Sequence, residues 1–285
     1  MNKMKVASTI EQTRDIVSFW RKQGLSVGLV PTMGYLHEGH KSLIERAAKE
    51  NDKVVVSVFV NPMQFGPNED YESYPRDFDK DISSCEDAGA NLVFHPEPEE
   101  MYSDTFSSFV DTTGVTEGLC GKSRPIHFRG VCTVVCKLFN IVQPDKAYFG
   151  QKDAQQLAVI RRMVRDLNMN LEVIGCPIIR EEDGLAKSSR NTYLNAEERK
   201  AALVLSKSLN LAKESIKSGE KDSAKIKALI EENINKEPLA KIDYVEVVDW
   251  DKNLDSKDTI EGPVLVAIAV YIGKTRLIDN FIIED

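Results

Sequence analysis

The feature that most constrains the fold is a regular alternation, through roughly the first 180 residues, of short apolar runs and longer segments with helical spacing. This alternation is typical of βαβ units, in which helices join the strands of a parallel sheet. The run VVVSVFV, residues 54–60, is apolar on both faces, as expected for a strand that helices cover on each side. We therefore predict an α/β fold with a Rossmann-like N-terminal domain. Its predicted strands cover residues 26–30, 54–60, 91–94, 146–149 and 171–178.

Helices are predicted before and between these strands, over residues 8–23, 40–51, 130–142 and 153–168. Ser8 and Glu11 have the spacing of a capping box at the start of the first of them. Asp153 is a reasonable N-cap for the last.

The pattern changes after the polar segment REEDGLAKSSRN, residues 180–191. Two amphipathic helices are predicted there, and three strand-like runs follow them without further alternation. Gly273-Lys274 lies between the last two runs and predicts a tight hairpin. We therefore predict a parallel-sheet domain over residues 1–184 and a smaller α+β domain over residues 185–285. The predicted C-terminal elements cover residues 196–218, 223–235, 242–248, 264–272 and 275–283.

Composition and charge narrow the classes of function. The formal net charge of −8 argues against nonspecific nucleic-acid binding, which requires clustered Lys and Arg. Residues 1–10 lack the apolar core of a signal peptide. No run approaches the ~18 apolar residues that a membrane helix requires. We expect a cytoplasmic protein that contacts neither nucleic acid nor membrane.

The cysteines are odd in number and scattered, which suits reduced thiols in a reducing compartment: Cys85, Cys120, Cys132, Cys136 and Cys176. Cys132 and Cys136 would lie one turn apart on a helix and could form a metal or redox pair. Burial as small apolar side chains is the favoured interpretation, because no His or second Cys pair accompanies them.

The first of five polar clusters is PTMGYLHEGHKSL, residues 31–43, directly after the first predicted strand. Gly39 lets the backbone pass close to a ligand, and His40 starts a helix, whose free N–H groups favour phosphate. His37 and His40 could both donate to a triphosphate. The alternative is a capping loop with two solvated histidines.

Two further clusters combine amide, aromatic and basic side chains. FVNPMQFGPNEDYESYPRD, residues 59–77, follows the second strand, and Asn61 and Gln64 could hold a carboxylate or hydroxyl without adding charge. GKSRPIHFRG, residues 121–130, is a dense basic loop in an acidic protein and indicates an anion site. A long loop and a surface patch without function are the alternatives for these two.

The last two clusters carry cations. YFGQKDAQQL, residues 148–157, follows a strand and places Lys152 at the rim of the sheet, where at most one of Gln155 and Gln156 can face inward with it. LAKSSRN, residues 185–191, is a short cationic loop suited to closing over phosphates. Ligands bind at the carboxyl ends of strands in open α/β sheets, so five clusters at or next to that edge predict a nucleotide site.

Taken together, PTMGYLHEGH, NPMQFG, HFRG, FGQKDAQQL and KSSRN resemble the pantoate–beta-alanine ligase family over essentially the whole chain. The first and last motifs also resemble the nucleotide-binding signatures of the wider adenylate-forming nucleotidyltransferase superfamily. The resemblance implies condensation of pantoate with beta-alanine through pantoyl adenylate, with release of pyrophosphate and AMP. It also implies ATP as substrate, Mg2+, and a homodimer formed through the N-terminal domain.

The resemblance implies roles for individual residues. His40 would be the proton donor, Gln64 would contact both pantoate and beta-alanine, and Gln156 would bind pantoate. Asn61, Tyr74 and Arg124 would be supporting substrate positions, and Asp153 would be a metal contact, with Mg2+ held mainly by phosphates. The implied ATP-binding residues are Met33, Gly34, Tyr35, Leu36, His37, Glu38, Gly39, His40, Gly150, Gln151, Lys152, Asp153, Ile179, Lys187, Ser188, Ser189 and Arg190.

A carboxylate that attacks the α-phosphorus brings two anions together, so catalysis must neutralise and position charge. The side chains suited to this task are His37, His40, Lys152, Ser188, Ser189 and Arg190. Two residues depart from the family pattern: Gln151 stands where Glu is frequent, and Lys187 stands where Met is usual. Lys187 adds a positive charge near the expected phosphates.

Other activities remain compatible with the fold. One is a nucleotidyltransferase that leaves AMP on its product. The others are a protein similar to aminoacyl-tRNA synthetases, which the acidic charge and the lack of an anticodon-binding domain oppose, and a nucleotide-sensing module without catalysis. A sensor would not need Gln64 and Gln156 in addition to the phosphate donors.

Overall fold

A computed structural model describes residues 3–67 and 69–284 of the chain. Residues 1, 2 and 285 and Asn68, which belongs to the second polar cluster, lie outside the described residues. The chain forms two compact units. The first unit comprises the residues up to Thr112, Arg124–Gln151 and Val159–Pro177, and the second comprises Thr113–Ser123, Lys152–Ala158 and the residues from Ile178 onward.

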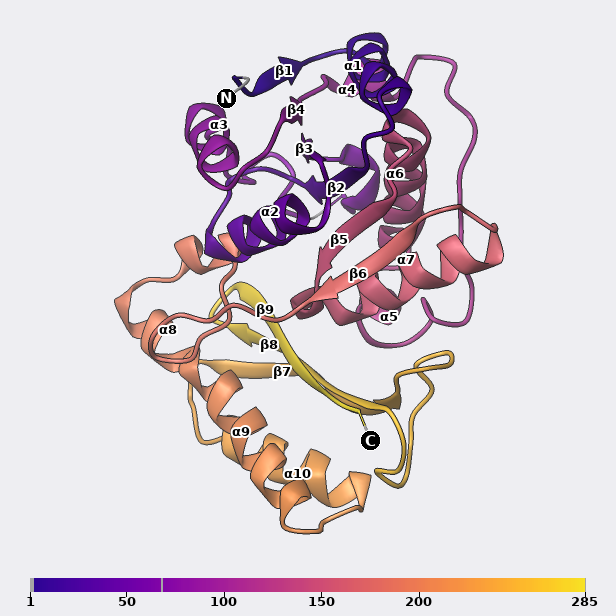
Figure 1. Ribbon diagram of the computed structural model, residues 1–285. Coiled ribbons are helices and arrows are strands. Elements are labelled where there is room, and N and C mark those ends of the chain that lie inside the picture. Colours follow the sequence, from indigo (N-terminus) through magenta and orange to yellow (C-terminus); the bar gives the residue numbers. More distant parts are fainter. Residues whose placement is uncertain (1–2, 68, 285) are drawn as a thin grey trace. The chain divides into compact units, whose positions relative to one another are not determined.

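The strands of the first unit form one parallel sheet in the order β1-β4-β3-β2-β5-β6 (Figure 1). The expected alternation of strands and helices is therefore confirmed. From β2 the chain continues through β3 and β4 in one direction and through β5 and β6 in the other, with β1 at the edge beside β4. The topological switch point therefore lies between β2 and β5. The strands are β1 (Lys5–Ala7), β2 (Val27–Thr32), β3 (Lys53–Val58), β4 (Leu92–Phe94), β5 (Lys146–Gly150) and β6 (Glu172–Cys176).

Helices cover both faces of this sheet, because its central strands are apolar on both sides. Val30 and Val56 pack with Ile44 of α2 and Cys85 of α3 on one face. The alternate residues Leu29 and Val55 are also fully buried, toward the other face. This unit contains α1 (Ile10–Lys22), α2 (Glu38–Glu50), α3 (Phe78–Asp87), α4 (Pro98–Met101), α6 (His127–Val142) and the part of α7 (Ala154–Asp166) from Val159 onward, with a 3-10 turn η1 (Pro62–Gln64).

The start of α1 differs from the prediction by one residue. Thr9, not Ser8, is the N-cap, and its side chain accepts the N–H of Gln12. Gln12 in turn accepts the N–H groups of Ser8 and Thr9, so Gln12 replaces Glu11 as the reciprocal partner. The predicted Ser8–Glu11 box is therefore wrong. Thr13, the residue after Gln12, is completely buried, and its burial fixes which face of α1 points into the protein.

The second unit is built on an antiparallel sheet of β7 (Ala240–Asp249), β8 (Val264–Ile272) and β9 (Thr275–Ile283). Gly273, with φ +57°, makes the predicted hairpin between β8 and β9. Figure 1 shows α9 and α10 along one face of this sheet. The helices are α5 (Leu119–Ser123), α8 (Ala196–Ala201), α9 (Leu203–Lys217) and α10 (Ser223–Ile234), with the 3-10 turn η3 (Ser189–Tyr193). The predicted helix over residues 196–218 is thus two helices that meet at Ala202.

Both faces of this smaller sheet are apolar, and this explains which segments belong to the second unit. Leu209 of α9 and Ile230 of α10 pack against Val266 and Ile268 on one face. Leu119 and Ala154 pack with Leu265 on the other. Ala154 starts α7 (Ala154–Asp166), after the 3-10 turn η2 (Gln151–Asp153). The compact units therefore do not follow the predicted division at residue 184, which stays a prediction about functional domains. No helix among the described residues is both long and apolar enough to cross a membrane.

Candidate active site

The loop between β2 and α2 takes its shape from two left-handed residues and a buried carboxylate. Gly34 and Tyr35 have φ values of +79° and +50°. Asp81 of α3 accepts the N–H groups of Tyr35 (2.9 Å) and Leu36 (2.7 Å). A Cβ at Gly34 would lie 2.8 Å from Asp81 Oδ2, so the close approach requires glycine. Burial raises the pKa of Asp81, against the effect of these two hydrogen bonds.

His37 and His40 form the predicted histidine pair at the start of α2. His37 is the N-cap and its Nδ1 accepts the Gly39 N–H at 3.1 Å, while His40 Nδ1 accepts the His37 N–H at 3.3 Å. The ring centroids lie 4.1 Å apart. A backbone N–H can only donate, so each Nδ1 is an acceptor and the proton of each neutral ring is on Nε2. Two ring N–H donors therefore accompany a helix N-terminus, a combination that favours an anion.

Gln64 is the residue on which the first three polar clusters converge. The residue is 8% exposed, and its Nε2 lies 3.2 Å from the sulfur of Met33 in the first cluster. Asn61, which caps η1, donates to Gln64 Oε1 (3.1 Å) and to the Gly130 carbonyl (3.2 Å). Tyr102 donates in turn to Asn61 Oδ1 at 2.7 Å. These contacts fix the amide of Gln64 within the first unit.

The basic third cluster is tied to the backbone of Gln64. His127 Nδ1 lies 2.9 Å from the Gln64 carbonyl, and Arg124 also contacts this carbonyl at 3.4 Å. Arg124 forms two hydrogen bonds to the carboxylate of Glu69. Burial acts to raise the pKa of Glu69, but the hydrogen bonds and charge of Arg124 outweigh it and the pKa is lowered. The positive charge of Arg124 is therefore balanced inside the protein.

Gly130, the last residue of the HFRG motif, allows α6 to pack against η1. A Cβ at this position would lie 2.2 Å from the Met63 carbonyl oxygen and 2.6 Å from Gln64 Cα. Backbone atoms cannot yield as a flexible side chain would, so the third and second clusters meet only because residue 130 is glycine. The motif is thus a packing motif as well as a source of cations.

Tyr74 and the residues after β5 complete the first unit's part of the predicted site. Tyr74 is 6% exposed and packs edge-on against the ring of Phe65, with centroids 6.1 Å apart. Gly150 ends β5, the strand beside β2, and Gln151 follows it. The first and fourth clusters therefore begin at neighbouring strand ends at the switch point, where ligands bind in sheets of this kind.

The second unit holds the rest of the fourth cluster. Lys152 Nζ lies 3.8 Å from Asp153 Oδ2, and the Lys152 side chain is 20% exposed. Gln155 is buried and bonds to the Cys120 N–H and to the carbonyls of Val115 and Gly118. Gln155 therefore anchors residues 115–120, and the half-buried Gln156 is the glutamine available to a ligand.

The fifth cluster follows a hairpin of the second unit. Arg180 pairs with Ala186, and the Lys187 N–H donates to the Ile179 carbonyl at 2.9 Å. Ser188 caps η3, and its Oγ accepts the Arg190 N–H at 3.3 Å. Ser189 is 7% exposed. The ammonium of Lys187 lies 3.0 Å from Glu181 Oε2, so the charge that departs from the family pattern has an anionic partner.

The described residues contain no cluster of three or more His, Cys, Asp or Glu side chains suited to a metal ion. All five cysteines are free thiols, and Cys132 and Cys136 contact Thr112 and Asn140 respectively. Burial raises the pKa of Cys132 to about 11. Cys132 is buried, as expected for a small apolar side chain, whereas Cys136 is only half-buried.

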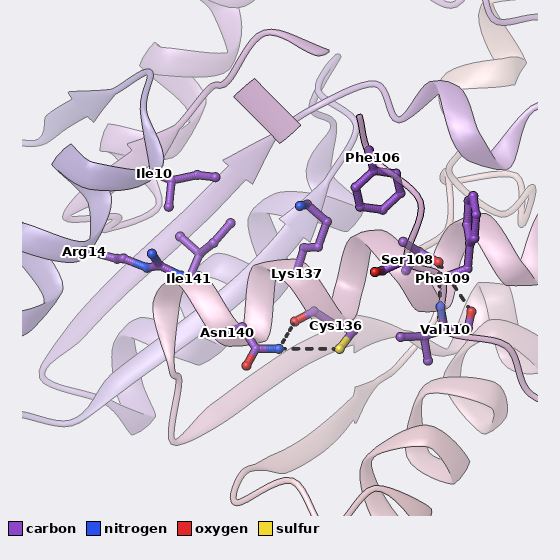
Figure 2. A pocket seen from close by; sticks show the side chains of 11 residues that line it. Ile10, Arg14, Phe106, Ser108, Phe109, Val110, Cys136, Lys137, Asn140 and Ile141 are labelled. Atoms are coloured by element: carbon purple, nitrogen blue, oxygen red, sulfur yellow. Dashed lines mark hydrogen bonds between the residues drawn. The ribbon is translucent and has the colours of Figure 1, made fainter. Parts of the chain in front are cut away.

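A pocket of about 290 Å³ lies elsewhere in the first unit and contains none of the predicted site residues. Figure 2 shows Ile10, Arg14 and Ile141 at one end and Phe106 and Phe109 at the other. The pocket is therefore formed by α1, α6 and the segment that carries the two phenylalanines. Phe109 is 41% exposed and stacks under Arg129, whose guanidinium carbon lies 4.0 Å from the ring centroid.

Two residues that matter for the site's shape, Asp81 and Glu69, were not predicted from the sequence, which also left open whether Gln155 or Gln156 faces inward. Asp81 lies in a helix that the local pattern did not reveal, and Glu69 lies in a segment interpreted only as a long loop. Asp81, Glu69 and Gln155 each act on a partner 35 to 55 residues away in the chain. The local signal available for Asp81 was its position on the buried side of α3, one turn before Cys85, where an apolar residue is expected.

The family model and the sequence relatives that match this chain name the same family. The family model described as pantoate-beta-alanine ligase matches residues 5–282. A pantothenate synthetase of Enterococcus faecalis is 67% identical over 281 residues, covering 99% of each chain. One from Clostridium acetobutylicum is 64% identical over 278 residues, covering 98% of this chain and 99% of the relative.

Solved structures agree with the sequence relatives. The crystal structure of pantothenate synthetase from Thermus thermophilus has a TM-score of 0.91 at 45% identity and covers 98% of this chain and 99% of its own. A pantoate-beta-alanine ligase from Francisella tularensis, solved with beta-gamma ATP and beta-alanine, has a TM-score of 0.79 at 35% identity. That match covers 98% of this chain and 97% of the Francisella chain.

Proposed function

The chain belongs to the pantoate-beta-alanine ligase family, and from this membership we propose how its residues share the reaction. The enzyme is an amide-forming ligase that condenses pantoate with beta-alanine, using ATP, to give pantothenate, AMP and pyrophosphate through pantoyl adenylate. The convergence of three polar clusters on Gln64 is the observation that carries the proposal for the substrate site.

We propose which residues of each unit, taken separately, contact ATP. In the first unit these are residues 33–40, Gly150 and Gln151, with the Nε2–H groups of His37 and His40 directed at phosphate. In the second unit they are Lys152, Asp153, Ile179 and residues 187–190. The support is the helix N-terminus beside two ring donors and the position of Gly150 at the switch point.

We propose that the side-chain amides of Gln64 and Gln156 contact the substrates. Gln64 lies beside Met33 and is oriented by Asn61, so a carboxylate or hydroxyl bound there adjoins the loop assigned to ATP. Neutral amides bind a carboxylate without forming an ion pair that would lower its nucleophilicity. Asn61, Tyr74 and Arg124 support this site. Because Arg124 bonds to Glu69, we propose that Arg124 holds the loop of residues 59–77 in place.

In the first step a pantoate carboxylate oxygen attacks the α-phosphorus, forming a new P–O bond as the bond to the bridging oxygen breaks and pyrophosphate leaves. The proposed roles of His37, His40, Lys152, Ser188, Ser189 and Arg190 are to position the phosphates and to balance charge that develops on the pyrophosphate. His40 donates its Nε2 proton in a hydrogen bond to a phosphate oxygen. The unprotonated Nδ1, held by a backbone N–H, keeps that proton on Nε2.

In the second step the neutral amine of beta-alanine attacks the acyl carbon. The C–N bond forms, the C–O bond breaks, and AMP leaves with that oxygen while the amine loses a proton. No described residue is assigned as the base for this proton, and Gln64 is proposed to orient the amine or its carboxylate. The labile adenylate makes exclusion of water important for this step.

We propose that Mg2+ accompanies ATP and is held mainly by phosphate oxygens, with Asp153 as a single carboxylate contact. Mg2+ is frequently bound through one or two carboxylates and substrate phosphates, and the half-exposed Asp153 fits that donor set. When bound, the ion neutralises phosphate charge. Loss of pantoate-dependent ATP–pyrophosphate exchange on chelation, restored by Mg2+, tests this assignment; retained exchange contradicts it.

We also propose a cytoplasmic homodimer that forms through the first unit. The five free thiols suit a reducing compartment. The pocket of Figure 2 and the exposed Phe109 give the first unit an apolar surface that a second copy could cover. Sedimentation equilibrium should give twice the chain mass for the natural protein and a reduced association constant for Phe109→Lys. A monomer at micromolar concentration would contradict the dimer.

The function is tested by measuring AMP and pyrophosphate release with Mg2+, ATP and pantoate, with and without beta-alanine. We expect stoichiometric AMP and pantothenate only when beta-alanine is present. A nucleotidyltransferase that leaves AMP on its product, the second candidate from the fold, would release pyrophosphate without free AMP in both conditions.

A further inference from the structure

Two neighbouring residues of β9 bond to the two segments of the second unit to which phosphate binding is assigned. Successive side chains of a strand point to opposite faces of the sheet, so Asp279 and Asn280 reach different partners. Both are almost completely buried, at 2% and 3% exposure. Neither residue belongs to a motif that the sequence pattern singles out.

Asp279 holds the hairpin that leads to Lys187. Its carboxylate accepts two parallel hydrogen bonds from Arg180, at 2.7 and 2.9 Å, and the N–H of Asn280 at 2.8 Å. Arg180 also donates to the Gly184 carbonyl in the turn of the hairpin, at 3.1 Å. A bidentate pair between arginine and a carboxylate has strict geometry, so it fixes the position of Arg180. Through Arg180 it also holds the turn of the hairpin.

Asn280 holds the backbone of Lys152. Its Nδ2 donates to the Lys152 carbonyl oxygen at 2.8 Å. A carbonyl can only accept, so the amide nitrogen must face it. The Lys152 side chain extends from a backbone unit that is thereby attached to a strand with a continuous antiparallel register to β8.

The strand itself is rigid enough to serve as a common anchor. Leu277 and Phe281, on the face of Asp279, are buried in the core formed with α9 and α10. Ile282, on the face of Asn280, packs against the core formed with Leu119 and Ala154. Lys213 of α9 lies over the ring of Phe281, and burial lowers the pKa of its ammonium group.

We propose that Asp279 and Asn280 are positioning residues of the ligase, which set the backbone of Lys152 and of the hairpin before residues 187–190. This inference rests on the proposed role of those residues in binding ATP phosphates. Neither side chain contacts ATP; each acts through the segment that it holds. Because misplacement of a catalytic group by about 1 Å can cost roughly 100-fold in rate, loss of either anchor affects adenylation.

Isosteric substitutions test the proposal with little change of volume. Asn280→Asp replaces the donor to the Lys152 carbonyl by an acceptor, and Asp279→Asn removes the bidentate acceptor of Arg180. Arg180→Lys keeps the charge but not the paired geometry and gives a second, milder variant. Asn233→Asp is the matched control for the first change, since Asn233 bonds to Ser208 on α9. Asp243→Asn is the control for the second change. Asp243 pairs with Arg276, which belongs to β9 as Asp279 does.

The readouts are pantoate-dependent ATP–pyrophosphate exchange, assayed well below each variant's Tm, and amide hydrogen exchange. We expect Asn280→Asp to lower kcat/KM for ATP by about 10- to 100-fold and to speed exchange over residues 152–158. Asp279→Asn should raise KM for ATP by about 10-fold and speed exchange over residues 179–187, with a smaller effect of Arg180→Lys. Both controls should remain within about threefold of the natural protein.

Lys152→Ala, measured in parallel, distinguishes a failure of the positioning role from a failure of the proposed phosphate contacts. If Lys152→Ala is impaired while Asn280→Asp and Asp279→Asn retain natural kinetics and exchange, the positioning role is overturned and the ATP site stands. If Lys152→Ala is unimpaired, the assignment of the phosphate contacts fails and the positioning role fails with it. A fall in Tm alone, with unchanged kcat and KM in the folded variants, shows a merely structural role and also overturns the proposal.

Discussion

At the scale of single residues, hydrogen-bond direction decides what the polar side chains can do. His37 and His40 each accept a backbone N–H through Nδ1, and this leaves the neutral rings as donors through Nε2. Lys187 departs from the family's usual Met, but its ammonium is paired with Glu181 and its net contribution to the local charge is small. Arg124 is similarly balanced by Glu69. Lys152 also lies near an anion, but its contact with Asp153 Oδ2, at 3.8 Å, is the longest of the three. We therefore expect the largest effect for Lys152.

Replacing one phosphate donor should slow adenylation without unfolding the enzyme. We expect His40→Ala and Lys152→Ala each to lose about 2.7–4 kcal/mol of transition-state stabilisation, roughly 10²–10³ in rate, as for loss of one oxyanion donor. ATP–pyrophosphate exchange with pantoate measures this directly. Lys217→Ala, which removes a surface ion pair with Glu214, is the control. Near-natural exchange in both site variants would remove these residues from the proposed mechanism.

At the scale of elements, the site depends on contacts that hold short irregular segments against helices. The turn η1 carries Gln64 and is held by Asn61, by His127 and by the close packing of α6 at Gly130. The loop before α2 is held by Asp81 of α3. Substrate contacts are thus placed by neighbours rather than by their own secondary structure.

Gly130→Ala tests the contact between α6 and η1. The added Cβ would meet backbone atoms at 2.2–2.6 Å, so η1 must move. We expect a stability loss of about 1–3 kcal/mol from overpacking, together with a raised KM for pantoate. Gly66→Ala is the matched control in the same loop, because the nearest atoms to its Cβ would be those of the Glu69 side chain, in ordinary contact at 3.7 Å. An unchanged KM for pantoate in a folded Gly130→Ala enzyme would contradict the placement of Gln64 by this contact.

Glu69→Gln should make stability depend less on pH. The folded-state pKa of Glu69 is lowered, so its ion pair with Arg124 stabilises the protein above the unfolded-state pKa and is lost as pH falls through the folded value. We expect Glu69→Gln to be about 1–3 kcal/mol less stable at pH 7, with the difference shrinking at an acidic pH below the ordinary glutamate pKa of about 4.3. Urea titrations at the two pH values measure it. An equal difference at both would show that the loss is not electrostatic.

Much of the element list could be predicted, because burial and periodicity are local properties of the sequence. The strands β8 and β9 have the predicted bounds, and the two-sided apolar run of β3 indicated a covered parallel strand. The strand β1, three residues long, and the helix α3 carry too little pattern to be found. The motif residues were found for a different reason, since the whole-length family resemblance supplied them.

At the scale of the whole molecule, the sequence pattern could not show which segments pack together through space. Residues 113–123 and 152–158 belong to the second unit because Leu119 and Ala154 fill the second apolar face of its sheet. Asp279 and Asn280 acquire their partners by the same folding of distant segments onto β9. Such contacts join residues 99 and 128 positions apart, and no local pattern encodes them.

The most direct test of the central claim follows one oxygen atom through the reaction. Pantoate labelled with ¹⁸O at both carboxylate oxygens is converted with ATP and beta-alanine, and the masses of the AMP and pantothenate are measured by mass spectrometry. Formation of pantoyl adenylate predicts one ¹⁸O atom in each AMP and one in each pantothenate. Unlabelled AMP would contradict the acyl-adenylate route and, with it, the roles proposed for the residues at the phosphates.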